Sequence, residues 1–211
     1  MFSEFAKFSS ATWGGIVALL LVGIVVFAVS KDKKRWTARM LANGALCIAL
    51  STVLSFITLY KMPQGGSITL ASMLPMFLFA YAYGVGPGML VGAAYGFVQF
   101  LQGGLYFVHP VELLLDYPLA FAMLGLAGLS NKFSDQWGMI PGIILGTFGR
   151  FVCAFLSGLI FFGMYAPAGK NVVIYSMVYN GLYLVPEASI CIVLAMIPQI
   201  RQLAKRLALQ D

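Results

Sequence analysis

Long apolar runs cover most of this chain of 211 residues, and most are close to the length of a membrane-spanning helix. A helix needs about 20 predominantly apolar residues to cross a hydrocarbon core about 30 Å thick. The runs lie at 12–30, 38–59, 70–83, 85–102, 109–129, 138–163 and 172–198. Charged residues make up only 9% of the chain, against about 25% in soluble domains. The sequence therefore predicts an all-α integral membrane protein.

The shortest run ends at a stretch rich in glycine and proline, AYGVGPG at 82–88. Glycine and proline break helices and favour tight turns. We therefore expect two short helices, at 70–83 and 85–102, rather than one long helix.

Basic residues are distributed unevenly between the two ends of the predicted helices. Nine follow the first, fifth or last helix, and they are Lys31, Lys33, Lys34, Arg35, Arg39, Lys132, Arg201, Lys205 and Arg206. Only Lys7, Lys61 and Lys170 fall on the other side. Because cytoplasmic loops carry the excess of Lys and Arg, this pattern predicts an N-terminus outside and a C-terminus in the cytoplasm. The net charge of +6 thus reflects topology and attraction to lipid headgroups, and we expect no nucleic-acid partner.

The first apolar run is open to two interpretations. Small residues at 28–30 suit a cleaved signal peptide. The positive cluster, however, follows the run instead of preceding it, which favours a retained helix. We therefore expect 1–36 to form an additional N-terminal transmembrane helix with a basic cytoplasmic loop, and 201–211 to form a basic cytoplasmic tail.

Two acidic residues, Glu112 and Asp116, lie within an apolar run. An intramembrane acid costs roughly 2.5–3.5 kcal/mol even on lenient insertion scales and usually faces a cavity, a partner charge or a ligand. Their four-residue spacing puts both on one helix face. The predicted topology places them in the outer half of the membrane, at the depth of Tyr175, Tyr179 and Asn180. We expect a polar pocket there, with Asp116 the deeper acid and Glu112 a supporting or solvated charge.

Other polar residues at this depth have two interpretations each. Asn180, Tyr183 and Glu187 share one helix face by their spacing, so they either line the pocket or join helices by hydrogen bonds. Arg150 and Glu187 are predicted to form a structural ion pair or a coupling element. Aromatic contacts to a ligand are expected from Phe151, Phe155 or Phe162.

Four segments together resemble the thiamine-binding S component of energy-coupling-factor (ECF) vitamin transporters. They are GGSITLASMLP at 65–75, HPVELLLDYP at 109–118, FFGMYAP at 161–167 and YSMVYNG at 175–181. The resemblance covers roughly 38–198 and implies a six-helix substrate-binding membrane domain, here 37–200, in a bacterial cell membrane. It also implies that the protein captures a vitamin at its outer face and delivers it through a transmembrane coupling protein and two ATPases.

The resemblance also implies roles for individual residues. Asp116, Tyr117, Tyr175 and Asn180 match the family's ligand-binding positions, and the loop 60–69 matches a lid over the ligand. The first family helix would contact the coupling module through small side chains at helical spacing, here Ala38, Ala42, Ala45 and Ala49. Ordinary intramolecular packing is the alternative for this alanine stripe.

Three positions depart from the family pattern. Ala154 replaces a histidine, and Phe162 and Gly66 stand where some members have tryptophan. The loss of an aromatic ring at Gly66 and of an imidazole at Ala154 removes stacking and hydrogen-bond partners, each typically worth about 1 kcal/mol or more. The expected ligand is therefore thiamine or a close relative, with a vitamin B6 form or a thiamine precursor as the alternative.

Two other classes of protein are alternatives to a binding component. A self-sufficient secondary transporter would typically show repeated halves and broken helices at the midplane, and the sequence shows neither. An enzyme would need a nucleophile and base or metal ligands, yet the chain has one His and three Cys without metal spacing. No Walker-type loop is present, so we expect no catalytic residue, no metal and no cofactor in this chain.

Overall fold

The structure, a computed structural model, describes residues 20, 24, 36–103, 110–132, 138–167, 169 and 171–209. The chain divides into two compact units, Met1–Lys31 and Asp32–Asp211. Only Leu20 and Ile24 are described in the first unit, where both are helical and more than half exposed. The predicted helix 12–30 otherwise lies outside the described residues.

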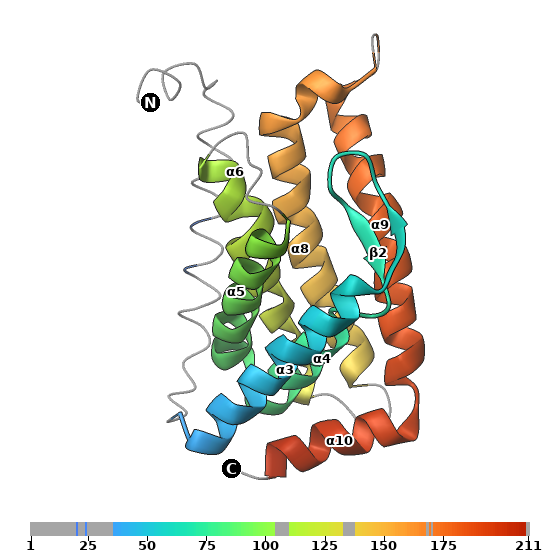
Figure 1. Ribbon diagram of the computed structural model, residues 1–211. Coiled ribbons are helices and arrows are strands. Elements are labelled where there is room, and N and C mark those ends of the chain that lie inside the picture. The colour runs from blue at the N-terminus through green and yellow to red at the C-terminus, as the bar shows by residue number, and fades with distance from the viewer. Residues whose placement is uncertain are drawn as a thin grey trace. The chain divides into compact units, whose positions relative to one another are not determined.

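Helices form most of the second unit, as Figure 1 shows. Their bounds are Ala38–Phe56 for α3, Leu74–Tyr83 for α4, Val85–Gln102 for α5, Met139–Phe161 for α8, Val172–Ala195 for α9 and Pro198–Leu209 for α10. Four described segments are long and apolar enough to cross a membrane: Ala38–Phe56, Val111–Asn131, Met139–Phe161 and Val172–Ala195. The prediction of a mostly helical membrane protein is confirmed.

Local sequence explains where several helices begin and end. The Thr37 hydroxyl accepts a hydrogen bond from the Met40 amide at 3.2 Å and caps α3. The Asn171 side chain caps α9 by accepting from the Val173 amide at 2.8 Å. Helices α4 and α5 separate at Gly84, whose φ of 95° suits a residue without Cβ. The predicted division of 70–102 into two helices is therefore confirmed.

The segment from Pro110 to Lys132 is one continuous but irregular helical path. It begins as α6 (Pro110–Leu114), widens into the π-helical turn η1 (Leu115–Leu119), passes through α7 (Ala120–Ala122) and tightens into η2 (Met123–Lys132). Pro118 lies inside the π turn, where it has no amide hydrogen to donate to the helix. Such π bulges are often found at functional sites, and this one contains Asp116.

Helix α4 lies at the centre of the hydrophobic core. Every residue from Leu74 to Tyr83 except Tyr81 is buried, which matches a helix that is apolar on all sides. Glycines allow the surrounding helices to approach closely. A Cβ at Gly92 of α5, for example, would overlap the Phe121 carbonyl oxygen of α7.

A β-hairpin connects α3 to α4, which corrects the all-α prediction. Strand β1 (Thr58–Lys61) pairs antiparallel with β2 (Ser67–Thr69), with Tyr60 opposite Ile68. The turn contains Gly65 at a φ of 98°. The hairpin takes the final residues of the predicted helix 38–59 and delays the predicted helix 70–83 until Leu74. Its position in the chain is that of the predicted lid, 60–69.

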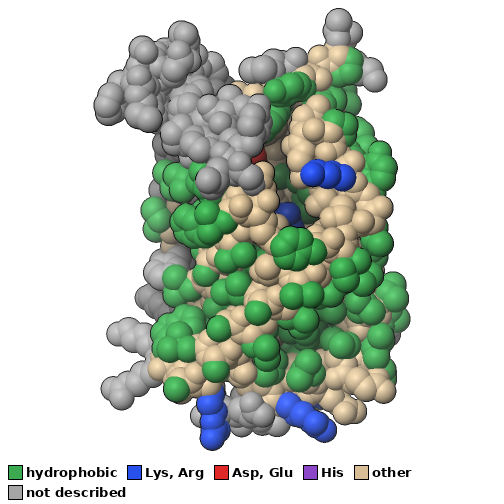
Figure 2. All heavy atoms as spheres, in the orientation of Figure 1, with side chains coloured by type: hydrophobic (Ala, Val, Ile, Leu, Met, Phe, Trp, Pro, Cys, Tyr) green, Lys and Arg blue, Asp and Glu red, His purple; other side chains and the backbone are tan. Residues whose placement is uncertain are grey.

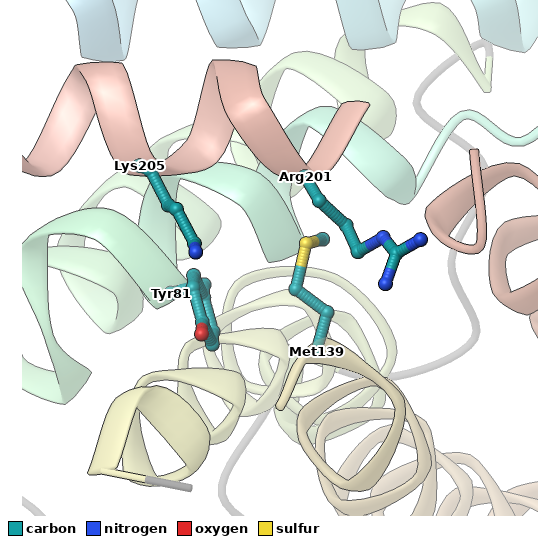
Figure 3. A pocket seen from close by; sticks show the side chains of 4 residues that line it. All are labelled: Tyr81, Met139, Arg201 and Lys205. Atoms are coloured by element: carbon teal, nitrogen blue, oxygen red, sulfur yellow. The ribbon is translucent and has the colours of Figure 1, made fainter. Parts of the chain in front are cut away.

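Most of the expected basic tail belongs to α10, which crosses the lower end of the bundle in Figure 1. Ala204 is fully buried, and Ile200 and Leu207 pack against the core on the same face. This spacing of four and three residues is typical of an amphipathic helix. Figure 3 shows a small recess under α10, where Arg201 and Lys205 lie beside Tyr81 and Met139.

Candidate substrate-binding site

Asp116 is a half-buried carboxylate on the π turn η1, within a segment apolar enough to span a membrane. Its Oδ2 accepts a hydrogen bond from the Ser157 hydroxyl of α8 at 2.7 Å. Ser157 is itself 1% exposed, so α8 fixes this carboxylate on one side. No described residue donates to Oδ1. Asp116 therefore keeps acceptor capacity for a ligand's amino or hydroxyl group.

Glu112 lies one turn before Asp116, and the structure corrects one of its two expected roles. Its exposed fraction is only 4%, lower than that of the half-buried Asp116. A solvated charge is thus excluded, because the carboxylate is enclosed by protein. A carboxylate such as that of Asp116 favours a cationic or amine-bearing ligand over an anion, through a charge-assisted hydrogen bond.

Arg150 of α8 supplies the positive charge at this level. Its guanidinium carbon lies 4.1 Å from the centroid of the Phe121 ring, a cation–π arrangement. Figure 2 shows acidic and basic side chains set back in the upper half of the visible face, among hydrophobic and uncharged groups, with a further basic group at the surface. Charged side chains are therefore few among the apolar ones on this face.

The polar residues of α9 form one buried stripe, as their spacing predicts. Ser176, Asn180, Tyr183 and Glu187 are each less than 9% exposed. The Asn180 amide nitrogen donates to the carbonyl oxygens of Ala154 at 3.2 Å and Ser176 at 2.9 Å, while its Oδ1 accepts from the Tyr183 hydroxyl at 3.0 Å. Both amide hydrogens are thus used within the protein, and only Oδ1 keeps a lone pair for a ligand.

The hairpin is fastened to α9 by two tyrosines of the predicted site. The Tyr179 hydroxyl accepts a hydrogen bond from the backbone amide of Gln64 at 3.0 Å. The Tyr175 hydroxyl donates a hydrogen bond to the side-chain Oε1 of Gln64 at 3.3 Å. The rings of Tyr175, Tyr179 and Tyr183 follow one another with centroid separations of 6.1 and 6.2 Å. The hairpin turn therefore lies against a row of phenol rings.

Gly66 explains why the hairpin fits so closely on this row. A Cβ at Gly66 would lie 2.8 Å from the Tyr183 ring, closer than real Cβ atoms approach. A tryptophan at this position would require Tyr183 to move. The departure at Gly66 is therefore matched by the ring of Tyr183, which fills the adjacent space.

Three predicted aromatic contacts pack against other rings. Tyr117 packs edge-on against Phe100 of α5, with centroids 5.4 Å apart. The Phe155 ring stacks on Phe151 at 6.0 Å, and Phe162 contacts Tyr165 at 5.9 Å. Their roles in binding stay predictions.

Arg150 and Glu187, both described, do not form the ion pair that was one of the two predictions for them. Arg150 lies over Phe121, whereas Glu187 accepts hydrogen bonds from Thr69 and Ser72. Sequence separation gave no basis for choosing these partners, because Thr69 is 118 residues from Glu187.

Two further contributors were missed from the sequence. Ser157, the partner of Asp116, lies seven residues after Arg150 and three after Ala154, a spacing that places all three on one face of α8. That pattern was a usable signal. Gln64, which contacts two tyrosines, lies in a loop and had no periodic signal.

Comparison with known proteins identifies the family. The sequence pattern of the family described as Thiamine transporter protein (Thia_YuaJ) matches residues 41–207. The chain is 36% identical over 160 residues to thiamine transporter ThiT of Bacillus subtilis (strain 168), covering 70% of this chain and 83% of that protein. It is 32% identical over 123 residues to thiamine transporter ThiT of Lacticaseibacillus paracasei, covering 52% of this chain and 61% of that protein.

A solved structure of ThiT from Listeria monocytogenes has the same fold. The TM-score is 0.70 at 24% sequence identity, over 80% of this chain and 96% of that chain. The family expected from the four sequence segments is thus confirmed, and it is a family of transporters and not of enzymes. The chain belongs to the thiamine transporter protein (Thia_YuaJ) family.

Proposed function

We propose that this protein is the thiamine-binding S component of an ECF-type importer. The observation that carries the proposal is Asp116, a half-buried acid in a segment apolar enough to span a membrane, whose Oδ1 accepts from no described donor. Thiamine carries a cationic thiazolium and an aminopyrimidine. A carboxylate can accept from the amino group by a charge-assisted hydrogen bond, and tyrosine rings can contact the cation.

In this proposal each part of the site has a separate task. Asp116 binds the amino group, and Ser157 holds Asp116 in place. Tyr175 and Tyr179 line the ligand and hold the hairpin over it. Asn180 joins α8 to α9 and offers Oδ1. Glu112 is a supporting residue, one helical turn from Asp116.

Calorimetric titration of the purified protein tests the proposal directly. Thiamine, its pyrimidine and thiazole fragments, and pyridoxine would each be titrated into protein in lipid nanodiscs. We expect thiamine to bind most tightly and the pyrimidine fragment to retain part of the affinity. Tightest binding of pyridoxine would favour the vitamin B6 alternative, and binding of none of them below the micromolar range would refute a vitamin site.

We also propose that the six helices of the family domain are α3, α4, α5, the path from Pro110 to Lys132, α8 and α9. The hairpin would face the outside and α10 the cytoplasm. In Figure 1 the hairpin lies beside the upper part of α9 and α10 lies at the lower end of the second unit, and Figure 2 shows Lys and Arg side chains below the hydrophobic region at the α10 end. The additional helix 12–30 and its basic loop remain a prediction, as does the N-terminus outside.

Helix α3 is the proposed contact with the transmembrane coupling protein. Ala38, Ala42, Ala45 and Ala49 are all exposed, so no part of the described chain covers this stripe. Small side chains let another helix approach closely. The ATPases of the importer would act through that contact, because this chain has no phosphate-binding loop.

Enlarging the alanine stripe is expected to stop transport without affecting ligand binding. For Ala45→Leu we expect thiamine uptake in liposomes containing the coupling module to fall roughly tenfold, because overpacking a helix contact costs about 1–3 kcal/mol. Titration should give an unchanged Kd. Ala94→Leu is the matched control, since Ala94 is an exposed alanine on α5.

Uptake by the protein alone would distinguish a secondary transporter from an S component. If liposomes without coupling protein and ATPases accumulated thiamine, the protein would be a secondary transporter and the S-component proposal would fail. Equal loss of uptake in Ala45→Leu and Ala94→Leu would remove α3 from the proposed contact.

A further inference from the structure

Glu187 is a buried carboxylate that the proposed binding site does not use. It lies within the membrane-spanning helix α9 and is 2% exposed. No ion pair links it to a described Lys or Arg. A charged side chain in such a position is costly unless protein donors replace its hydration. Its hydrogen bonds therefore indicate what it does.

Among the described residues, the donors to Glu187 come from the base of the hairpin and the turn that follows it. Oε1 accepts from the Thr69 hydroxyl at 2.5 Å and the Ser72 hydroxyl at 2.8 Å, and Oε2 lies 3.4 Å from the Thr69 amide. Thr69 ends β2, and Ser72 lies in the turn that leads into α4. One side chain of α9 thus fixes both sides of this turn.

The turn held by Glu187 is strained. Ala71 has a φ of 57°, the left-handed region that residues with a Cβ rarely occupy, and it is 1% exposed. Its amide donates to the Thr69 carbonyl oxygen at 2.9 Å. Such conformations persist where surrounding contacts enforce them, and the Glu187 hydrogen bonds lie immediately on both sides.

The hairpin is therefore attached to α9 at two levels with different partners. Its turn binds through Gln64 to Tyr175 and Tyr179, which belong to the candidate ligand site. Its base binds through Thr69 to Glu187, which does not belong to the candidate ligand site. The two attachments use different partners, so the turn can leave the phenols and return to them while the base stays attached.

We infer that Glu187 is a positioning residue that anchors the base of the hairpin, so that the hairpin opens and closes over the ligand about a fixed point. This inference rests on the proposed function, in which the hairpin covers the ligand. It predicts that loss of the anchor raises the rate of ligand dissociation. Glu187 itself does not touch the ligand.

Hydrogen exchange of the ligand-free protein in nanodiscs tests the anchor independently of any ligand. Glu187→Gln removes the charge and turns an NH2 group toward the Thr69 amide, so that two donors face each other. We expect amides in 58–72 to exchange roughly tenfold faster, with α8 unchanged. Ser189→Ala is the matched control, because Ser189 is an exposed α9 residue bonded only within its helix.

The second arm measures thiamine dissociation by rapid mixing. Glu187→Gln and Thr69→Val should each release thiamine several-fold faster with little change in the association rate, and Thr69→Ser should restore the wild-type rate by restoring the hydroxyl. Thr69→Val keeps the test usable if Glu187→Gln does not fold.

Unchanged exchange at 58–72 in both variants, or faster exchange spread equally over α8, would overturn the anchor. Failure of the wild-type protein to bind thiamine would refute the proposed function instead, and the exchange result would still decide the role of Glu187.

Discussion

Replacing Asp116 with asparagine is expected to weaken thiamine binding at least tenfold. The substitution keeps the size of the side chain and its contact with Ser157 but removes the negative charge. A hydrogen bond to a charged group contributes roughly 1.5–3 kcal/mol, which corresponds to roughly a 10- to 150-fold change in Kd. Titration calorimetry of the variant in nanodiscs measures this loss.

Two serine variants test whether the loss of affinity in Asp116→Asn comes from the Asp116 carboxylate itself. Ser157→Ala leaves the carboxylate in place but removes its donor at 2.7 Å, so we expect a smaller loss of affinity, up to about tenfold. Ser189→Ala should bind as the wild type does. If Asp116→Asn bound thiamine with unchanged affinity, Asp116 would not be in the site and the proposed ligand geometry would be wrong.

The second large effect is expected on stability, at the contact between α5 and α7. A Cβ at Gly92 would overlap the Phe121 carbonyl oxygen and lie 3.1 Å from its carbon. Backbone atoms cannot rotate away as a side chain can. We therefore expect Gly92→Ala to destabilise the protein by about 1–3 kcal/mol and to lower its melting temperature in detergent.

The same substitution at a second glycine is the matched control. Nothing lies within 4 Å of a Cβ built at Gly181 of α9. Alanine is favoured over glycine in a helix by about 0.8–1.0 kcal/mol, so Gly181→Ala should melt at or above the wild-type temperature. Equal melting temperatures for the two variants would show that the α5–α7 contact tolerates a methyl group.

Local periodicity predicted the parts of the fold that depend on neighbouring residues. The apolar runs predicted the spans, and the glycine-rich sequence near Gly84 predicted the division between α4 and α5. The spacing of Asn180, Tyr183 and Glu187 predicted one face of α9, which is buried. It left open whether that face binds a ligand or joins helices. Asn180 uses both amide hydrogens to join them.

The hairpin and α10 were missed for different reasons. Residues 58–69 mix apolar and polar side chains without a sustained period, so a short two-stranded ribbon had no clear signal. In α10, the basic residues led to the prediction of a basic tail, although Ile200, Ala204 and Leu207 have the spacing of a packed helix face. The helix is stabilised by burial of that face against the core, which a charge count does not measure.

The sequence by itself determined that this protein lies in a lipid bilayer, where its membrane-spanning segments are, which family it belongs to and which helix faces carry polar groups. Each of these depends on composition or on spacing within one element. Only the tertiary structure decided which polar groups meet. It brought Ser157 to Asp116 and Thr69 to Glu187, and it left Arg150 over Phe121. Such pairs join residues far apart in the chain, and their geometry is set by how the helices and the hairpin pack together.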